Sequence, residues 1–311
     1  MDISNASTEP FCRFHSFHEE FNRSTKVAFG ALQALMRSDK PLTILETGDE
    51  PWGPYTEWRD PIREARAGIK FLSAMGIVRV MSAFEDLLVT VDAEYSRTAF
   101  LRAAAASQPN VEDTDEDEPL LKNVCGRLGW STDPVAFAMP LYDLFSVTRN
   151  CIVHRSGRAS KALVQVAESP PLASSHAAWP RRKGTRLPKL PAITVGKEIR
   201  LFPRHAILAS SVCYEIARYL NGKLVDTIGG TGLVYMAAYH SLLSDDKIEI
   251  FAKKSPEVII RHVLADRYRL KEVGIAETVD SLKKMGKWQL CRLAYRDFEP
   301  KGTQLQTQSK C

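Results

Sequence analysis

Apolar residues follow a helical spacing along most of the chain. The longest series has intervals of three, four and five residues and comprises Ile69, Leu72, Ile77, Val80, Phe84, Leu87, Leu88 and Val91. This spacing is typical of a helix that is buried on much of its surface. Asp60, Pro61 and Glu64 precede it as an N-cap, a first-turn proline and a first-turn acid. The pattern predicts a long helix from Asp60 to about Ala106, with a break near Gly76.

Shorter stretches with the same spacing predict further helices. One opens at Phe202-Pro203 and ends at Asn221-Gly222, since asparagine and glycine favour the left-handed conformation that stops a helix. Another begins at Ser255-Pro256-Glu257, where serine is a good N-cap and proline fits the first turn. The predicted helices span residues 17–37, 120–128, 141–155, 203–221, 233–243 and 256–270.

Two segments depart from the helical pattern. Residues 168–192 contain Pro170, Pro171, Pro180, Pro188 and Pro191, which predicts a loop. Residues 193–201 alternate β-branched and polar side chains about a glycine, which predicts a small β-hairpin or an extended pair. Residues 162–167 fit a strand or a continuing helix equally well. The expected fold is mainly α, a helical bundle with a small β-hairpin insertion and a helical C-terminal extension.

The same features predict the domain organisation. We expect an N-terminal extension in residues 1–59, a helical domain in 60–227, a basic helical region in 228–302 and a disordered polar tail in 303–311. A chain of 311 residues is longer than one core usually fills, and 44% hydrophobic residues suffice for a substantial core.

Composition places the protein in a broad class. No apolar run reaches the roughly 18 to 20 residues that a membrane span needs, and the N-terminus lacks the basic-then-apolar pattern of a secretory signal. The six cysteines show no CxxC spacing, so reduced thiols are expected rather than a zinc site or disulfides. We expect a soluble cytoplasmic protein with no membrane partner, no metal and no cofactor.

Charge is distributed unevenly along a chain whose formal net charge is +5. Residues 111–119 carry six acids in nine positions, but they lack the glycine and the later glutamate of a calcium loop, so a solvated connector is expected. Lys253 to Arg296 carries eleven Lys or Arg against five acids, a net +6. This segment fits an RNA-recruiting appendage or a basic packing extension.

The candidate chemistry lies in the predicted helix that ends at Arg155. At 100° per residue, Leu141, Phe145, Thr148 and Ile152 form one stripe, while Asn150 and His154 lie on roughly the opposite side and Arg149 lies at the border. The helix therefore presents an amide, an imidazole and a guanidinium together. Basic residues near it are candidate phosphate ligands: Arg155, Arg158, Arg181, Arg182 and Lys183.

Arg149-Asn150-Cys151-Ile152-Val153-His154 resembles the RNxxxH form of the Rx4-6H motif of HEPN-domain ribonucleases. The setting is similar too. A long helix with Ser82-Ala83-Phe84-Glu85-Asp86-Leu87-Leu88 precedes the motif helix, and a last helix ends at Tyr219-Leu220-Asn221-Gly222. The resemblance covers roughly residues 60–225 and implies a HEPN-like helical bundle.

The resemblance implies a metal-independent endoribonuclease, of a kind used as a toxin or as an anti-phage defence effector, with RNA as substrate. The expected partners are a second copy facing the first through the motif helix and an antitoxin or phage-derived trigger. Because RNA supplies the 2′-OH nucleophile, cleavage needs only proton transfer and a cation at the phosphate. We assign proton transfer to His154, phosphate stabilisation to Arg149 and positioning to Asn150.

A structural role is the alternative for the same residues. Arg149 can pair with Asp143 or Glu85, and His154 can hydrogen-bond a backbone carbonyl. The protein would then be a catalytically silent module that binds RNA or another protein. Three isolated histidines, His205, His240 and His262, are expected to be structural.

Overall fold

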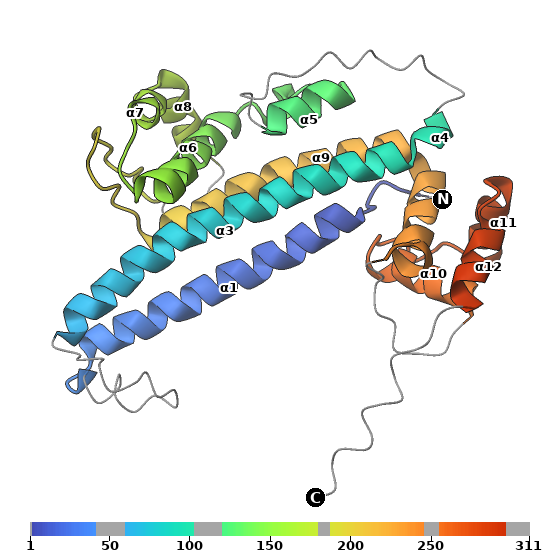
Figure 1. The fold of residues 1–311 in the computed structure, drawn as a ribbon, viewed down its shortest axis with the longest axis horizontal. Coiled ribbons are helices and arrows are strands. Elements are labelled where there is room, and N and C mark those ends of the chain that lie inside the picture. Colours follow the sequence, from blue (N-terminus) through green and yellow to red (C-terminus); the bar gives the residue numbers. More distant parts are fainter. Residues whose placement is uncertain (1, 42–59, 103–119, 180–186, 246–254, 297–311) are drawn as a thin grey trace, which may run out of the picture. The chain divides into compact units, whose positions relative to one another are not determined.

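The computed structural model describes residues 2–41, 60–102, 120–179, 187–245 and 255–296. This part of the chain is mainly α-helical, as the apolar spacing predicts (Figure 1). None of the helices in these ranges has the length and apolarity needed to cross a membrane. The α-helices are α1 (Glu9–Arg37), α3 (Pro61–Arg97), α4 (Ala99–Arg102), α5 (Leu120–Leu128), α6 (Met139–Arg155), α7 (Lys161–Ala167), α8 (Pro170–Ala178), α9 (Pro203–Ala238), α10 (Pro256–Asp266), α11 (Ile275–Lys284) and α12 (Trp288–Arg296). A 3-10 helix, η1, covers Asp133–Val135, and a π-helix, η2, covers Tyr239–Leu243.

The chain divides into two compact units, each assembled from segments far apart in the sequence. The terminal unit contains Met1–Arg13, Leu87–Trp130 and Leu220–Cys311. The motif unit contains Phe14–Asp86 and Ser131–Tyr219. The helices α3 and α9 each contribute residues to both units, and the predicted domain of residues 60–227 stays a prediction.

Long helices that lie side by side form the core of the motif unit. The Phe14 ring of α1 meets the edge of Phe84 of α3 with 5.8 Å between centroids, and Phe84 meets Tyr142 of α6 at 5.5 Å. These contacts join α1, α3 and α6, and Figure 1 shows α1, α3 and α9 running alongside one another. The helix α6 also packs against α7 and α8.

The start of α3 follows the prediction, but the expected break near Gly76 is absent. The Asp60 carboxylate accepts a hydrogen bond from the Arg63 N–H at 3.0 Å, as an N-cap does. A Cβ atom at Gly76 would lie 2.9 Å from the Cβ of Ala206. Glycine therefore lets α3 and α9 approach closely while both stay helical.

The predicted helix end at Asn221-Gly222 is wrong, because α9 continues to Ala238. Asn221 is buried, and its Oδ1 accepts hydrogen bonds from the Thr8 N–H at 2.8 Å and the Thr8 hydroxyl at 2.9 Å. Its Nδ2 donates to the Ala6 carbonyl at 3.1 Å. The amide thus serves tertiary contacts, and the kink occurs at Gly229, with φ 62° and ψ 179°, a conformation that essentially only glycine adopts.

Part of the predicted loop is helical. Residues Pro170–Ala178 form α8, with proline in the first turn, where its missing N–H costs nothing. Residues 162–167, which fitted two predictions, belong to α7, and Ser160 caps this helix by accepting from the Leu163 N–H at 3.1 Å. Prolines that indicate a loop in sequence therefore open a helix here.

The predicted hairpin at residues 193–201 appears in the described chain as a turn and a single bridge. Gly196 has φ 73°, and Arg158 forms an isolated antiparallel bridge with Glu198. The Ile199 N–H donates to the Gly157 carbonyl at 3.0 Å, and the Ala159 N–H donates to the Lys197 carbonyl at 2.9 Å. The segment therefore pairs with the chain just after α6 rather than with itself.

Candidate functional site

The motif lies on a helix fixed by its apolar side. Along α6 the buried residues are Leu141, Tyr142, Leu144, Phe145, Thr148 and Cys151. On the other side Asn150, Val153 and His154 are exposed, and Arg155 is exposed at the helix end. The predicted division into an apolar face and a polar face is thus confirmed, with Ile152 half-buried at the border.

The helix ends immediately after the motif through a left-handed residue. Ser156 has φ 51° and ψ 38°, and its N–H donates to the Cys151 carbonyl. The Gly157 N–H donates to the same carbonyl at 3.0 Å, and Gly157 has φ 75°. These bonds close the last turn of α6. His154 and Arg155 consequently stand in the last turn, where a cation also interacts favourably with the helix dipole.

Arg149 is held at one edge of the motif. Its Nη1 donates to Asn150 Oδ1 at 3.0 Å, and its Nη2 lies 3.5 Å from Glu85 Oε2 on α3. The Arg149 side chain is 24% exposed, and its Nε is buried without a hydrogen-bond partner in the described part of the chain. The guanidinium is therefore oriented by neighbours on two helices and retains donors that those neighbours do not use.

His154 occupies the open part of the site. It is exposed, and it has no hydrogen-bond or ion-pair partner among the described residues. Asn150 lies four residues earlier on the same helix, so the two side chains share a face about 5–6 Å apart at their Cβ atoms. An imidazole in this position is accessible to a ligand and to bulk solvent.

The predicted phosphate ligands divide into three groups. Arg155 is exposed at the helix end. Arg158 is exposed and its Nη1 donates to the Gly196 carbonyl at 3.3 Å, which ties it to the 193–201 turn. Arg181, Arg182 and Lys183 lie outside the described residues.

The chemistry available to this group is proton transfer beside a fixed cation. An imidazole can accept or donate a proton, and a guanidinium forks onto two oxygens of a phosphate. An amide beside it donates or accepts hydrogen bonds. Within the described ranges, no group of three or more His, Cys, Asp or Glu side chains is arranged to hold a metal ion.

Two of the three isolated histidines have buried structural partners, as expected. His205 Nδ1 accepts from the Phe202 N–H at 3.1 Å and its Nε2 is 2.8 Å from the Lys189 carbonyl. Burial lowers the pKa of His205, while the bond to Lys189 opposes that shift. His240 Nε2 lies 2.8 Å from Glu94 Oε1, and both side chains are buried. His262 is exposed.

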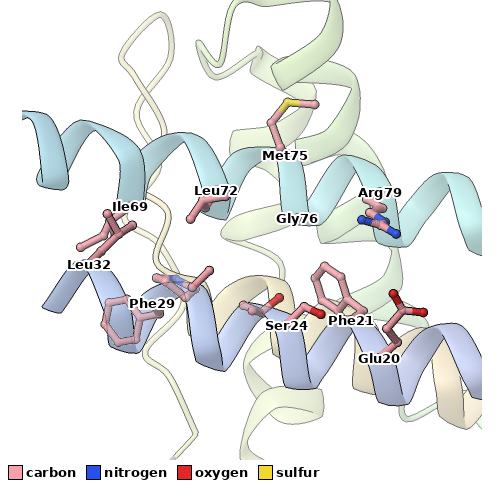
Figure 2. A pocket seen from close by; sticks show the side chains of 13 residues that line it. Glu20, Phe21, Ser24, Phe29, Leu32, Ile69, Leu72, Met75, Gly76 and Arg79 are labelled. Carbon is pink, nitrogen blue, oxygen red and sulfur yellow. The ribbon is translucent and has the colours of Figure 1, made fainter. Parts of the chain in front are cut away.

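A pocket in the motif unit lies apart from the motif. It has a volume of about 210 Å³ and lies between α1 and α3 (Figure 2). Figure 2 shows Leu32 and Ile69 at its apolar end and Glu20 and Arg79 at the other. None of the predicted site residues lines it, so we base the functional argument on the exposed motif.

Glu85 is the neighbour that the sequence indicated only as an alternative partner. The sequence indicated this partner in one way: Glu85 lies on the predicted long helix, and a carboxylate on a neighbouring helix can pair with an arginine of the motif. Because Glu85 and Arg149 are far apart in the sequence, helical spacing could not predict their contact. The Ser160 hydroxyl, 3.5 Å from Cys151 Sγ, carried no signal in the sequence.

No family model, no curated protein and no solved structure matches the chain.

Proposed function

We propose that the protein is a metal-independent endoribonuclease of the HEPN type. One observation carries the proposal: an accessible His154, without a partner among the described residues, stands on the same exposed helix face as Asn150, beside a guanidinium oriented by Asn150 and Glu85. The motif order Arg-Asn-x-x-x-His supports the same assignment. A HEPN-like bundle over residues 60–227, including the hairpin, is part of the proposal.

The reaction follows from RNA chemistry. The 2′-oxygen attacks the adjacent phosphorus, its proton passes to a base, and the bond to the 5′-oxygen breaks as that oxygen receives a proton. Arg149 stabilises the negative charge that develops on the phosphate oxygens. Asn150 positions the phosphate, and Arg155 and Arg158 hold neighbouring phosphates, together with Arg181, Arg182 and Lys183. The products are a 2′,3′-cyclic phosphate and a free 5′-OH.

A second copy of the chain completes the proposed site. The two proton transfers occur on opposite sides of the phosphorus, so a single imidazole does not serve both. A two-fold homodimer with its α6 helices facing each other supplies a second His154. Val153 is 48% exposed on this helix and offers an apolar contact to the partner copy. We assign the enzyme to the cytoplasm, as a toxin or anti-phage effector controlled by an antitoxin or a phage-derived trigger.

The test is cleavage of RNA by the purified full chain in the presence of EDTA. We expect wild-type protein to cut, and His154→Ala to abolish cutting, with 2′,3′-cyclic phosphate ends detected by mass spectrometry of the fragments. His262→Ala, which also removes an exposed histidine, is the matched control and should cut like the wild type. Cutting by His154→Ala, loss of cutting in EDTA, or fragments with 3′-OH ends would contradict the proposal.

The Arg149–Glu85 ion pair favours a second candidate, a silent module that binds RNA without cutting it. In that case Arg149 has a structural role and His154 has none. Such a protein would leave RNA intact, and His154→Ala would bind RNA as the wild type does.

A further inference from the structure

Aromatic rings and cations alternate at one place in the terminal unit. The Lys287 ammonium lies 4.9 Å from the Phe100 ring centroid and 5.9 Å from that of Tyr235. The rings of Phe100 and Tyr235 meet edge to face, 5.1 Å apart at 87°. The Arg97 guanidinium lies 4.8 Å from the centroid of Tyr239. We call these five residues the cation–aromatic patch.

The patch is accessible rather than part of the core. Phe100 is 41% exposed and Arg97 is exposed, while Tyr235, Tyr239 and Lys287 are half-buried. Burial raises the pKa of Tyr235, Tyr239 raises it further and Arg97 lowers it, so these members of the patch lie in one neighbourhood. The Phe100 ring contacts Lys287 and Tyr235, but its exposure leaves part of the ring available to a flat ligand.

The surrounding helices are basic. Residues 255–296, which include α10, α11 and α12, carry nine Lys or Arg against five acids. The helix α12 packs against η2, the π-helix that contains Tyr239. Short π-helical segments occur often at functional sites. Residues 255–296 therefore carry a net charge of +4, which favours a polyanion as ligand.

We infer that the cation–aromatic patch binds single-stranded RNA, with a base stacked on Phe100 and phosphates bound by Arg97 and Lys287. Stacking platforms for single strands combine exposed aromatic faces with cations that follow the backbone. An acidic peptide would use the two cations but would leave the aromatic faces without a role. The choice of RNA rests on the proposed function. The patch in the terminal unit would capture the substrate for that function.

The test measures binding of a fluorescent 12-nucleotide single-stranded RNA to the full chain carrying His154→Ala, so that cleavage does not interfere. We expect Phe100→Leu, which keeps an apolar side chain but removes the ring, to weaken binding about tenfold. Phe100→Trp should bind at least as tightly as the parent. Thermal melting of each variant, followed by circular dichroism, checks that the fold is retained.

Salt dependence tests the role of the cations. Arg97→Gln with Lys287→Gln should lower the slope of log binding constant against log salt by about 1.4, at about 0.7 for each phosphate contact of a single strand. Arg261→Gln with Lys271→Gln removes the same charge from exposed positions of the same unit and should leave the slope unchanged. An equal loss in both pairs would overturn the inference, because it would show attraction by net charge alone.

Three other outcomes also overturn the inference: unchanged binding by Phe100→Leu, equally tight binding of a duplex, or RNA photocross-links that avoid peptides with Phe100, Tyr235 and Tyr239. The cross-linking needs no substitution in the patch and decides the matter if Phe100→Leu fails to fold. Patch-dependent binding without cleavage by the His154-containing protein would refute the proposed function and keep this inference. Cleavage without patch-dependent binding would do the reverse.

Discussion

Arg149 and Glu85 meet across two helices, with 3.5 Å between Nη2 and Oε2, although they are 64 residues apart in the chain. Their side chains are 24% and 38% exposed. An ion pair this open to water contributes at most about 1 kcal/mol to stability. The contact therefore acts mainly on the direction of the guanidinium, and under the proposed function its importance should be visible in catalysis rather than in folding.

Replacing Arg149 by lysine should separate charge from geometry. Lysine keeps the positive charge but cannot fork onto Asn150, Glu85 and a phosphate at once. We expect Arg149→Lys to reduce RNA cleavage about 100-fold or more, the usual effect of losing one transition-state donor. Its free energy of unfolding should change by less than about 1 kcal/mol. Arg204→Lys, at an exposed position outside the proposed site, is the matched control, and an equal loss of cleavage in both variants would refute the special role of Arg149.

The buried pair of Glu94 and His240 should matter for folding instead. Glu94→Ala leaves the His240 imidazole buried without its partner, 2.8 Å from where the carboxylate was. We expect the free energy of unfolding, measured in urea, to fall by about 3 kcal/mol. Asp92→Ala breaks a more exposed ion pair, with Arg127 at 2.8 Å, and should cost about 1 kcal/mol or less. Similar losses in both variants would contradict this ranking.

Asn221 should be essential to the N-terminal segment of the terminal unit. Asn221→Ala removes the acceptor of the buried Thr8 N–H and hydroxyl, together with the donor to Ala6. Buried groups left without partners should cost about 2 kcal/mol of unfolding free energy in total. Asn150→Ala removes an exposed asparagine amide and should change stability by less than about 0.5 kcal/mol. A small effect at Asn221 would show that these bonds are replaced by others.

His205 should make stability depend on pH in a defined direction. Burial lowers its pKa below the ordinary 6.5, so the unfolded chain binds more protons than the folded chain. Stability from this group is full above pH 6.5 and is lost as the pH falls below 6.5 towards the lowered folded value. We expect His205→Gln to flatten the decline of unfolding free energy with falling pH in that range. A steeper decline in the variant would reverse the assignment.

The end of α6 should gain stability from a single glycine. Ser156 adopts φ 51°, a region in which a residue with a Cβ is strained by about 1 kcal/mol. Ser156→Gly should therefore raise the melting temperature, whereas Gly157→Ala, at φ 75°, should lower it. Opposite signs in the two neighbours would confirm that backbone conformation decides the effect, and a loss of stability in Ser156→Gly would contradict it.

Local signals in the sequence located most helices. Asp60 and Pro61 marked the start of α3, Pro203 the start of α9, and the apolar stripe of α6 assigned its two faces. The predictions were wrong where a residue has a partner far away in the sequence. Asn221 indicates a helix end in isolation, but its amide binds Thr8 more than 200 residues away.

The sequence predicted only the part of the site that lies on a single helix. The face shared by Asn150 and His154 follows from helical periodicity, which needs no tertiary information. The orientation of Arg149 depends on Glu85 of another helix, and the position of Arg158 depends on a turn at Gly196. Both contacts depend on packing between separate segments, and the sequence alone does not show which segments pack together.

The interleaving of segments limits how this protein can be dissected. Each unit takes residues from separate stretches, and the boundaries at residues 86–87 and 219–220 fall inside α3 and α9. A deletion at either boundary would cut a continuous helix and remove core residues from both units. Separate roles for the two units will therefore have to be assigned by point substitutions or by complementation between co-expressed fragments, because no contiguous fragment contains one whole unit without residues of the other.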